Sequence, residues 1–245
     1  MKRLIISGAA GRMGKAVAAL SREYGFETVA GIDVKAEAQC GFPLCSSYAL
    51  CRENADMMID FSRASHLMQT LDFAKAHRLP AVIGTTGLEA AHEEMLASAA
   101  ESIPILQSAN FSLGIQTLKK LCLQAKACLP DFDIEIVERH HAQKTDAPGG
   151  TALMLLQAVS DPEACPVYGR YAALQKREKQ EIGIHSLRGG TLCGSHETGF
   201  YGQGEHLLIT HVAEDRSIFA RGALMCARWL LDQPPGRYGA GDVLQ

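Results

Sequence analysis

The chain has 245 residues, 47% hydrophobic and 21% charged, which is a composition typical of a globular protein with a buried core. A formal net charge of −3 with no run of Lys or Arg argues against a nucleic-acid partner. The eight cysteines form no C-x-x-C pair, no H-E-x-x-H occurs, and neither a membrane-length apolar run nor room for a signal peptide is visible, so we expect a cytoplasmic protein without a metal site.

The first predicted elements are a short buried strand at residues 4–6, a glycine-rich turn and a helix. The turn and the first residues of that helix read Gly8-Ala9-Ala10-Gly11-Arg12-Met13-Gly14. Glycines at such spacing allow a tight turn, let the backbone approach a pyrophosphate and let the helix pack closely on the strand. The N–H groups at the helix start then face the phosphates. We therefore predict that residues 8–13 bind a dinucleotide.

The next strand, at residues 28–32, ends in Asp33. An acid about twenty residues beyond such a glycine turn accepts hydrogen bonds from the adenosine ribose, which favours NADH. Lys35 could instead meet the 2′-phosphate of NADPH, so both cofactors remain open. The structural alternative for Asp33 is a turn or helix-capping residue.

Three further buried strands are predicted at residues 57–59, 80–83 and 103–106, with helices at 65–77 and 88–100, while 41–54 is an irregular connection. Alternating strands and helices predict a doubly wound parallel, Rossmann-like α/β domain, whose ligands collect at the carboxyl ends of the strands. The residues expected at that edge, besides the glycine turn and Asp33, are Phe61, Gly84, Thr85, Thr86, Ser108, Ala109, Asn110 and Phe111.

Beyond Phe111 the periodicity changes to that of an α+β domain with an open mixed sheet. The predicted helices lie at 114–129 and 151–160, and the predicted strands at 134–137, 182–186, 195–201 and 206–212. A last amphipathic helix, 218–231, is expected to return to the first domain. We therefore assign residues 1–111, completed by 222–245, to a dinucleotide-binding domain, and residues 112–221 to a substrate-binding and oligomerisation domain.

The segment from Glu138 to Ala152 carries the densest set of reactive side chains. A strand is expected to end at Val137 and to be followed by a loop containing His140, His141, Lys144 and Asp146. The bland interpretation is a solvated polar loop. The chemical interpretation is a site for an anionic substrate. Lys144 and the N–H groups of Gly150 and Thr151 at a helix start would bind carboxylates, His141 would add a hydrogen bond, and either His140 or Lys144 could be the acid. Asp146 would orient Lys144 or cap the helix.

These motifs together resemble the 4-hydroxy-tetrahydrodipicolinate reductase family over nearly the whole chain. The resemblance is carried by GAAGRMG at 8–14, IDFS at 59–62, VIGTTG at 82–87, ANFS at 109–112, ERHHAQKTDAPGGTA at 138–152, IGIHSLRGG at 182–190 and FARGA at 219–223. It implies reduction of the cyclic product of dihydrodipicolinate synthase to tetrahydrodipicolinate by NADH or NADPH, in the bacterial route to diaminopimelate and lysine. It also implies a homotetramer, with His140 as proton donor or acceptor and Lys144 as a donor that also holds a carboxylate.

The sequence departs from the family pattern at two positions. Gly149 stands where the family often has Ser, so a hydroxyl that could bond a substrate carboxylate is missing, and Ser195 stands where the family usually has Glu. Two other functions remain as alternatives: a related nicotinamide-dependent oxidoreductase for another small amino or oxo acid, and a non-catalytic nicotinamide-binding sensor. Because cofactor and substrate must meet, we expect a hinge closure between the domains.

Overall fold

The computed structural model describes residues 1–35, 40–171 and 176–244. The chain divides into two compact units, Met1–Leu113 with Ser217–Gln245, and Gly114–Arg216. Residues 217–221, which the sequence analysis assigns to the second domain, belong to the first unit. The reason is that helix α6 (Ser217–Leu230) is continuous and buries Ala220, Ala223 and Leu224 in the core of that unit.

The first unit contains a parallel sheet of seven strands in the order β12-β6-β5-β4-β1-β2-β3. The strands are β1 (Lys2–Ser7), β2 (Phe26–Ile32), β3 (Leu44–Cys45), β4 (Met57–Asp60), β5 (Ala81–Ile83), β6 (Pro104–Gln107) and β12 (Gly236–Tyr238). The helices are α1 (Arg12–Leu20), α2 (Leu67–Ala76), α3 (Ala90–Ala100) and α6, with short 3₁₀ turns at Ser21–Tyr24, Tyr48–Leu50, Ala64–His66 and Asp242–Leu244. The predicted Rossmann-like sheet is confirmed, and β3 and β12 extend it at edges where the sequence predicted no strand.

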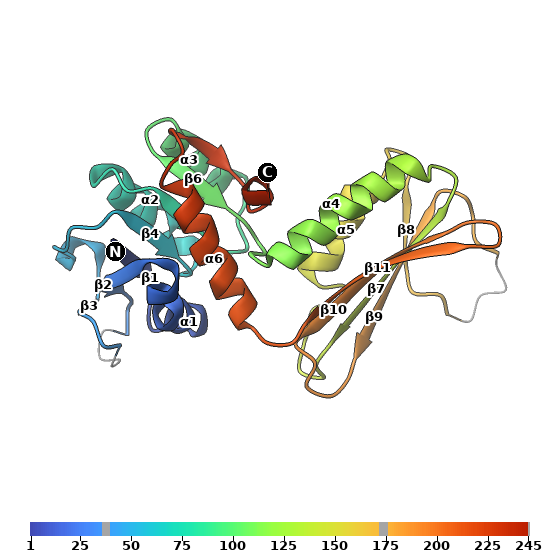
Figure 1. Cartoon of the computed structure of the whole chain (residues 1–245), viewed down its shortest axis with the longest axis horizontal. Helices are drawn as coiled ribbons and strands as arrows, with labels where there is room; N and C mark the ends of the chain where they lie inside the picture. The colour runs from blue at the N-terminus through green and yellow to red at the C-terminus, as the bar shows by residue number, and fades with distance from the viewer. Residues whose placement is uncertain (36–39, 172–175, 245) are drawn as a thin grey trace. The chain divides into compact units, whose positions relative to one another are not determined.

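Both faces of this sheet are covered, which explains why its strands are continuous apolar runs rather than alternating ones. Leu4 and Ile6 of β1 lie in a core with α6 and Val17 of α1, whereas Ile5 lies in the opposite core with residues of α2 and α3. Figure 1 shows α6, in red, lying alongside α1. The strand order reverses between β1 and β4, so their carboxyl ends form the crevice in which such sheets bind ligands.

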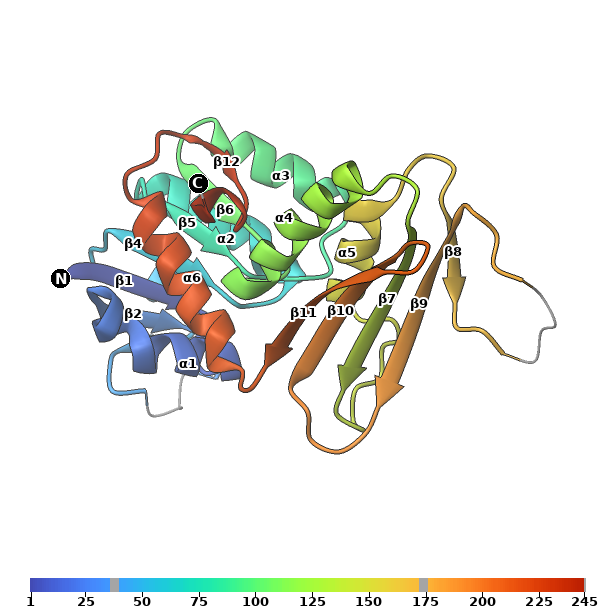
Figure 2. The same cartoon turned by 45° about the vertical axis from the view of Figure 1, so that its right-hand side comes forward.

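The second unit contains a mixed sheet of five strands in the order β11-β10-β7-β9-β8. The strands are β7 (Asp133–His140), β8 (Cys165–Tyr168), β9 (Glu181–Arg188), β10 (Gly194–Tyr201) and β11 (His206–Ala213), and the helices are α4 (Leu113–Cys128) and α5 (Gly150–Val159). β7 pairs in parallel with β9 and antiparallel with β10. Both helices lie on one face of the sheet (Figure 2). The predicted α+β unit is confirmed, with β8 as an additional strand.

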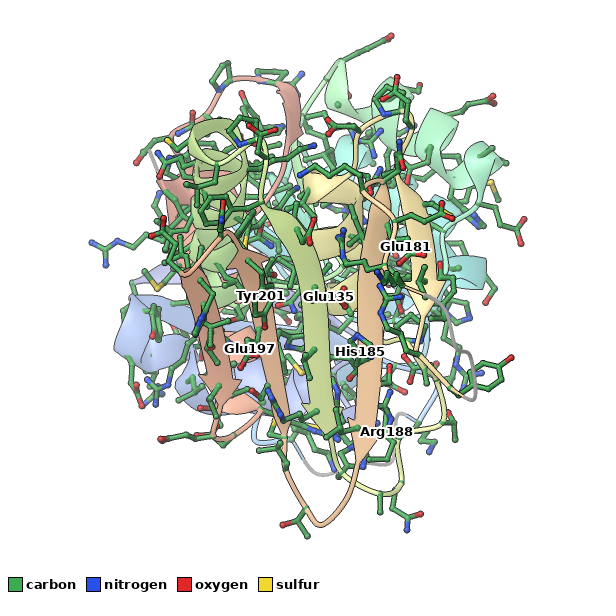
Figure 3. The ribbon with its side chains drawn as sticks, turned by 90° about the vertical axis from the view of Figure 1, so that its right-hand side faces the viewer. Glu135, Glu181, His185, Arg188, Glu197 and Tyr201 are labelled. Atoms are coloured by element: carbon green, nitrogen blue, oxygen red, sulfur yellow. The ribbon has the colours of Figure 1, made fainter. Side chains whose placement is uncertain are left out.

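Strand β7 continues to His140 rather than ending at Val137, and this extension determines where the polar side chains point. Its burial alternates, so Ile134, Ile136 and Glu138 are buried on the helix-covered face. Glu135 lies on the opposite face, beside His185 of the neighbouring strand (Figure 3). The prediction that His140 belongs to a loop is therefore wrong: its backbone is fixed by pairing with Arg188 of β9.

Candidate functional site

The largest set of predicted cofactor residues lies around a pocket of about 320 Å³ in the first unit. The pocket lies at the carboxyl ends of β1, β2 and β4. The predicted residues that line it are Gly8, Ala10, Gly11 and Asp33, together with Lys35 and Phe61. Its other lining residues are Ser7, Ile32, Val34, Ser46, Ser47, Tyr48, Ser62, Arg63, His66 and Gln69.

The shape of the turn requires glycine at two positions. Gly8 has φ +74°, and a Cβ there would lie 2.5 Å from the carbonyl oxygen of Phe61. A Cβ on Gly14 would lie 2.3 Å from the carbonyl oxygen of Gly8. Both distances are far below a van der Waals contact, so no side chain fits without moving the backbone. The turn therefore holds the start of α1 close to the ends of β1 and β4.

Asp33 is connected to this turn by hydrogen bonds. Its Oδ2 accepts the N–H of Ala10 at 3.0 Å, and its Oδ1 accepts the N–H of Lys35, also at 3.0 Å. The carboxylate is thus held in the pocket wall by two backbone groups. A carboxylate fixed at the end of the second strand is suited to accept hydrogen bonds from ribose hydroxyls.

The remaining predicted cofactor residues do not line this pocket. Ala9 is buried in the core, and Arg12 and Met13 lie in the first turn of α1. Residues 84–86 follow β5 and residues 108–111 follow β6, next to the ring of Phe61. That ring lies 5.7 Å from the ring of Phe111, and a Cβ on Gly84 would overlap it at 2.3 Å. Cofactor binding by these two segments stays a prediction.

Side-chain hydrogen bonds fix the conformation of both segments. Thr85 Oγ1 donates to the buried carboxylate of Asp60 at 2.6 Å. Ser108 Oγ donates to the carbonyl oxygen of Asn110 at 2.8 Å, and the Asn110 side chain accepts the N–H of Ser112 at 2.8 Å. Both segments are therefore held in defined conformations at the edge where ligands bind.

Part of the pocket wall comes from residues 41–54, whose irregular sequence predicts neither an element nor a site. Tyr48 lines the pocket, and its hydroxyl lies 2.8 Å from Ser7 Oγ and 2.6 Å from Thr70 Oγ1. His66 also lines it. Tyr48 lies outside the predicted strands and helices, and His66 falls in the predicted helix at 65–77, so no sequence signal marked either residue as part of a site.

In the second unit, His140 belongs to a buried polar cluster at the end of β7. Its Nδ1 is hydrogen bonded to Glu138 Oε2 at short distance, and its ring meets the ring of His196 edge to face at 5.1 Å. Glu138 Oε1 accepts from Arg188 Nη2 at 2.6 Å and from the N–H of Gly149 at 3.2 Å. Glu138, Arg188 and His196 are members of the site that the sequence did not predict.

The ionisation of this cluster follows from burial and from its charged partners. Burial raises the pKa of the Glu138 carboxyl, but hydrogen bonds from Arg188, Ser186 and His140 outweigh burial and lower that pKa to about 2. Burial lowers the pKa of His140 below its usual value, although Glu138 acts against this. Burial, with a smaller contribution from His140, lowers the pKa of His196 to about 4. Glu138 is therefore an anion at neutral pH, beside a neutral His196.

These pKa shifts predict that acid destabilises the second unit. As pH falls through 6.5, the unfolded state binds a proton at His196, whereas the folded state does so only near pH 4, so stability is lost across that window. Between pH 7 and 5 the loss from His196 alone is about 2 kcal/mol. Urea unfolding of His196→Gln should show a smaller loss than the parent protein, with His206→Gln as the control. Equal losses in the His196 variant and the parent would contradict the assignment.

Lys144 forms a separate ion pair in the loop after β7. Its Nζ lies 2.7 and 2.8 Å from the two carboxylate oxygens of Asp146, and these hydrogen bonds lower the pKa of that carboxyl. The N-cap of α5 is Gly149, which has no side chain to accept a hydrogen bond. Of the two roles considered for Asp146, the structure therefore supports orientation of Lys144 and not helix capping.

The remaining predicted substrate residues surround the start of α5. Gly150 and Thr151 form its first turn, whose N–H groups give a helix N-terminus its affinity for anions. A Cβ on Gly149 would lie 3.0 Å from Lys144 Cε, so Lys144 and the helix start are neighbours. His141 Nε2 lies 3.4 Å from Arg216 Nη2. All five predicted catalytic and substrate residues thus lie at one end of the sheet of the second unit.

Glu138, His140 and His196 also place three potential ligand atoms within 4.8 Å of one another. A metal ion there would lie beside the Arg188 guanidinium, which is 2.6 Å from Glu138 and carries a permanent positive charge. The arrangement therefore suits a hydrogen-bonded cluster better than a cation site. In the part of the chain that the structure describes, no helix has both the length and the apolar character needed to cross a bilayer.

Comparison with known proteins agrees with this architecture. Residues 2–111 match the family model for the N-terminus of dihydrodipicolinate reductase, and residues 114–244 match that for its C-terminus. The 4-hydroxy-tetrahydrodipicolinate reductase of Caldanaerobacter subterraneus subsp. tengcongensis is 44% identical, covering 100% of this chain and 99% of its own length. That of Campylobacter lari is 41% identical over 98% of this chain and 97% of its own.

Solved structures show the same fold. The dipicolinate-bound dihydrodipicolinate reductase from Paenisporosarcina sp. TG-14 has a TM-score of 0.82 at 24% identity and covers 99% of both chains. The scyllo-inositol dehydrogenase from Lactobacillus casei, solved with bound NAD(H) and scyllo-inositol, has a TM-score of 0.63 at 15% identity, covering 100% of this chain and 93% of its own.

The fold and the family matches define an NAD(P)H-dependent oxidoreductase with a Rossmann-like unit and a second, mixed-sheet unit. The chain belongs to the dihydrodipicolinate reductase family. Membership carries the reductase role in diaminopimelate and lysine biosynthesis, with NADH or NADPH as the hydride donor. The predicted family, fold class, function and cofactors are confirmed, and the two alternatives are not favoured.

Proposed function

We propose that the loop and helix start following β7 bind the dicarboxylate 4-hydroxy-tetrahydrodipicolinate, and that His140 supplies the proton that accompanies hydride transfer. The observation that carries this proposal is the different bonding of the two candidate acids. Lys144 forms an ion pair with Asp146, which suits a permanent cation that binds a carboxylate. His140 is hydrogen bonded to Glu138, which raises the pKa of the imidazole against the effect of burial and suits a group that exchanges a proton.

The other residues of the site complete the binding of the substrate. The N–H groups of Gly150 and Thr151 meet one substrate carboxylate with Lys144, and His141 adds a hydrogen bond. In the first unit, residues 8–13, Asp33, 84–86 and 108–111 bind the dinucleotide. The cofactor supplies the hydride, and these residues hold it at the carboxyl edge of the sheet.

A coupled assay tests the function. The protein is supplied with freshly made product of dihydrodipicolinate synthase, and oxidation of NADH and of NADPH is followed in separate reactions. We expect substrate-dependent oxidation with at least one cofactor. Oxidation with neither would overturn the proposed reaction.

Asp33 and Lys35 are expected to set the preference between the two cofactors. Replacing Asp33 with Ser removes a charge that repels a 2′-phosphate, so the ratio of kcat/KM for NADPH to that for NADH should rise about tenfold, equivalent to about 1.4 kcal/mol. Because Asp33 also holds the N–H of Ala10, absolute rates should fall with both cofactors. Lys35→Met should change the ratio in the opposite direction. An unchanged ratio in both variants would exclude these residues as determinants.

Gly149 provides a second test of the site. Gly149→Ser restores a hydroxyl at the start of α5, and its Cβ requires only a small movement of the flexible Lys144 side chain. We expect dipicolinate, used as a competitive inhibitor, to bind about fivefold more tightly, because a hydrogen bond to a charged carboxylate is among the stronger kinds. Gly149→Ala adds the Cβ without the hydroxyl and should give no gain. Equal inhibition of both variants and the parent would contradict the proposed carboxylate position.

We further propose that the enzyme is a cytoplasmic homotetramer and that the two units close on each other during turnover. Closure is expected because the nicotinamide must reach a substrate held by the second unit. Light scattering measures the oligomer, and a mass other than that of four chains would exclude the tetramer. Solution X-ray scattering with and without NADH and dipicolinate measures closure, and identical profiles would exclude it.

A further inference from the structure

Glu138 is a buried carboxylate to which the proposed reaction assigns no role. It is fully buried, although it lies on the same strand as the site residue His140. A buried charge is retained only where partners compensate for its lost hydration. The described partners of Glu138 are His140, Arg188, Ser186 and the N–H of Gly149. Four groups near the end of β7 are therefore organised around one carboxylate.

We propose that Glu138 is a positioning residue for the reaction, which holds His140 in one tautomer and orientation and maintains its capacity to donate a proton. This proposal rests on the proposed role of His140. Glu138 touches neither substrate nor cofactor in this account, and it acts only through the imidazole.

The geometry of β7 explains why the pair is rigid. Glu138 and His140 are two residues apart on one strand, so their side chains lie on the same face of the sheet. Their backbones pair with Ser186 and Arg188 of β9, and Glu138 also pairs with His196 of β10. The carboxylate thus reaches Nδ1 of the imidazole from a backbone held on both sides.

The hydrogen bond to Glu138 determines which nitrogen faces the reaction. An ionised carboxylate accepts only, so Nδ1 carries the hydrogen and Nε2 becomes the exchangeable position. Nε2 lies beside Gly194, where a Cβ would be 3.0 Å away, so glycine keeps this edge free of a side chain. The arrangement is analogous to that of a hydrolase triad, in which a carboxylate orients the catalytic histidine.

Charged and titratable groups from every neighbouring element act on His140. Glu138 on β7 raises its pKa, while Lys144 of the loop and Arg188 of β9 lower it. His196 of β10 packs against its ring. His211 of β11 lies opposite His196, and Asp146 is paired with Lys144. Glu138 is the carboxylate in direct hydrogen bond with the imidazole, so its removal should lower the pKa of His140.

Two substitutions are expected to shift the pKa of His140 in opposite directions. Glu138→Gln removes the charge with little change in volume, and the pKa of His140 should fall, because Glu138 raises it. Arg188→Gln removes a positive charge 2.6 Å from Glu138, and the pKa of His140 should rise. Glu135→Gln is the matched control, because Glu135 also bonds a histidine, His185, at 2.8 Å but on the opposite face of the same sheet (Figure 3).

The experiment measures the tautomer and pKa of the His140 imidazole, and separately the rate of the reaction. ¹⁵N NMR of histidine-labelled protein, with the resonances assigned by His140→Gln, follows tautomer and pKa. The pH profile of kcat is measured on the same variants, with near-ultraviolet circular dichroism and NADH binding as checks of folding. We expect Glu138→Gln to lower kcat at pH 7.5 about 10- to 100-fold with little change in KM, and to move the alkaline limb of the profile to lower pH. Arg188→Gln should move that limb to higher pH, and Glu135→Gln should leave it in place.

Three results would overturn the proposal. The first is an unchanged His140 tautomer and pKa in folded Glu138→Gln. The second is an NMR shift without movement of the kcat profile. If Glu138→Gln does not fold, the test rests on Arg188→Gln alone. An unchanged pKa of His140 in that variant is the third result. Failure of the proposed function is distinguishable from all three. Absence of NADH and NADPH oxidation in the parent protein would overturn the reaction, and full activity of His140→Gln would remove His140 from it, whatever Glu138 does to the imidazole.

Discussion

Replacing His140 with glutamine is expected to lower kcat by about 10² to 10⁴-fold, the range that a positioned general acid contributes. Glutamine fills a similar volume and keeps a hydrogen bond to Glu138, but it does not donate a proton to the substrate. Because the side chain lies in the second unit, binding of NADH by the first unit should change less than twofold. Steady-state kinetics and a fluorescence titration with NADH measure the two quantities.

The control for this substitution is His206→Gln, which changes a histidine of the same unit that stacks on Tyr201. That variant should retain the activity of the parent. A His140 variant with full activity would remove His140 from the mechanism, and an equal loss in both variants would indicate general damage to the sheet.

Replacing Lys144 with alanine is expected to lower kcat/KM by about 10³-fold, equivalent to about 4 kcal/mol. The substitution removes the cation that is proposed to bind a substrate carboxylate and leaves the Asp146 carboxylate, now unpaired, to repel a dicarboxylate ligand. The inhibition constant of dipicolinate should rise in parallel. The affinity for NADH should not change.

Asp146→Asn is the matched control for Lys144, because it breaks the same ion pair and leaves the ammonium in place. We expect a loss below about tenfold, since an exposed ion pair contributes little and the cation remains to bind the ligand. If Asp146→Asn were as damaging as Lys144→Ala, the ion pair and not the cation would be the functional unit. Unchanged inhibition by dipicolinate in Lys144→Ala would exclude Lys144 from carboxylate binding.

The first unit was predictable because its determinants are local. The strands around Ile5, Met58 and Val82 are short apolar runs followed by glycine or polar residues, and burial on both faces produces such runs. β3 and β12 were missed because strands of two and three residues at a sheet edge have no periodicity of their own. They form only because a neighbouring strand offers hydrogen-bonding groups.

The candidate site was predictable in its residue types but not in its connections. The loop composition indicated His140, His141 and Lys144, whereas the role of Glu138 depends on the alternation of β7 and on Arg188 of another strand. Such a pairing across fifty positions of sequence is not visible from local patterns. The alternation Ile134, Ile136, Glu138 was the one available signal, since it places a carboxylate at the end of an apolar stripe.

A crystal structure of the protein with NADH and dipicolinate would show whether residues 140–151 bind the substrate. We predict that one carboxylate of the ligand lies within hydrogen-bonding distance of Lys144 Nζ and of the N–H groups of Gly150 and Thr151, with His140 Nε2 facing the ring. An ordered dipicolinate that contacts none of these residues would exclude them as the substrate site.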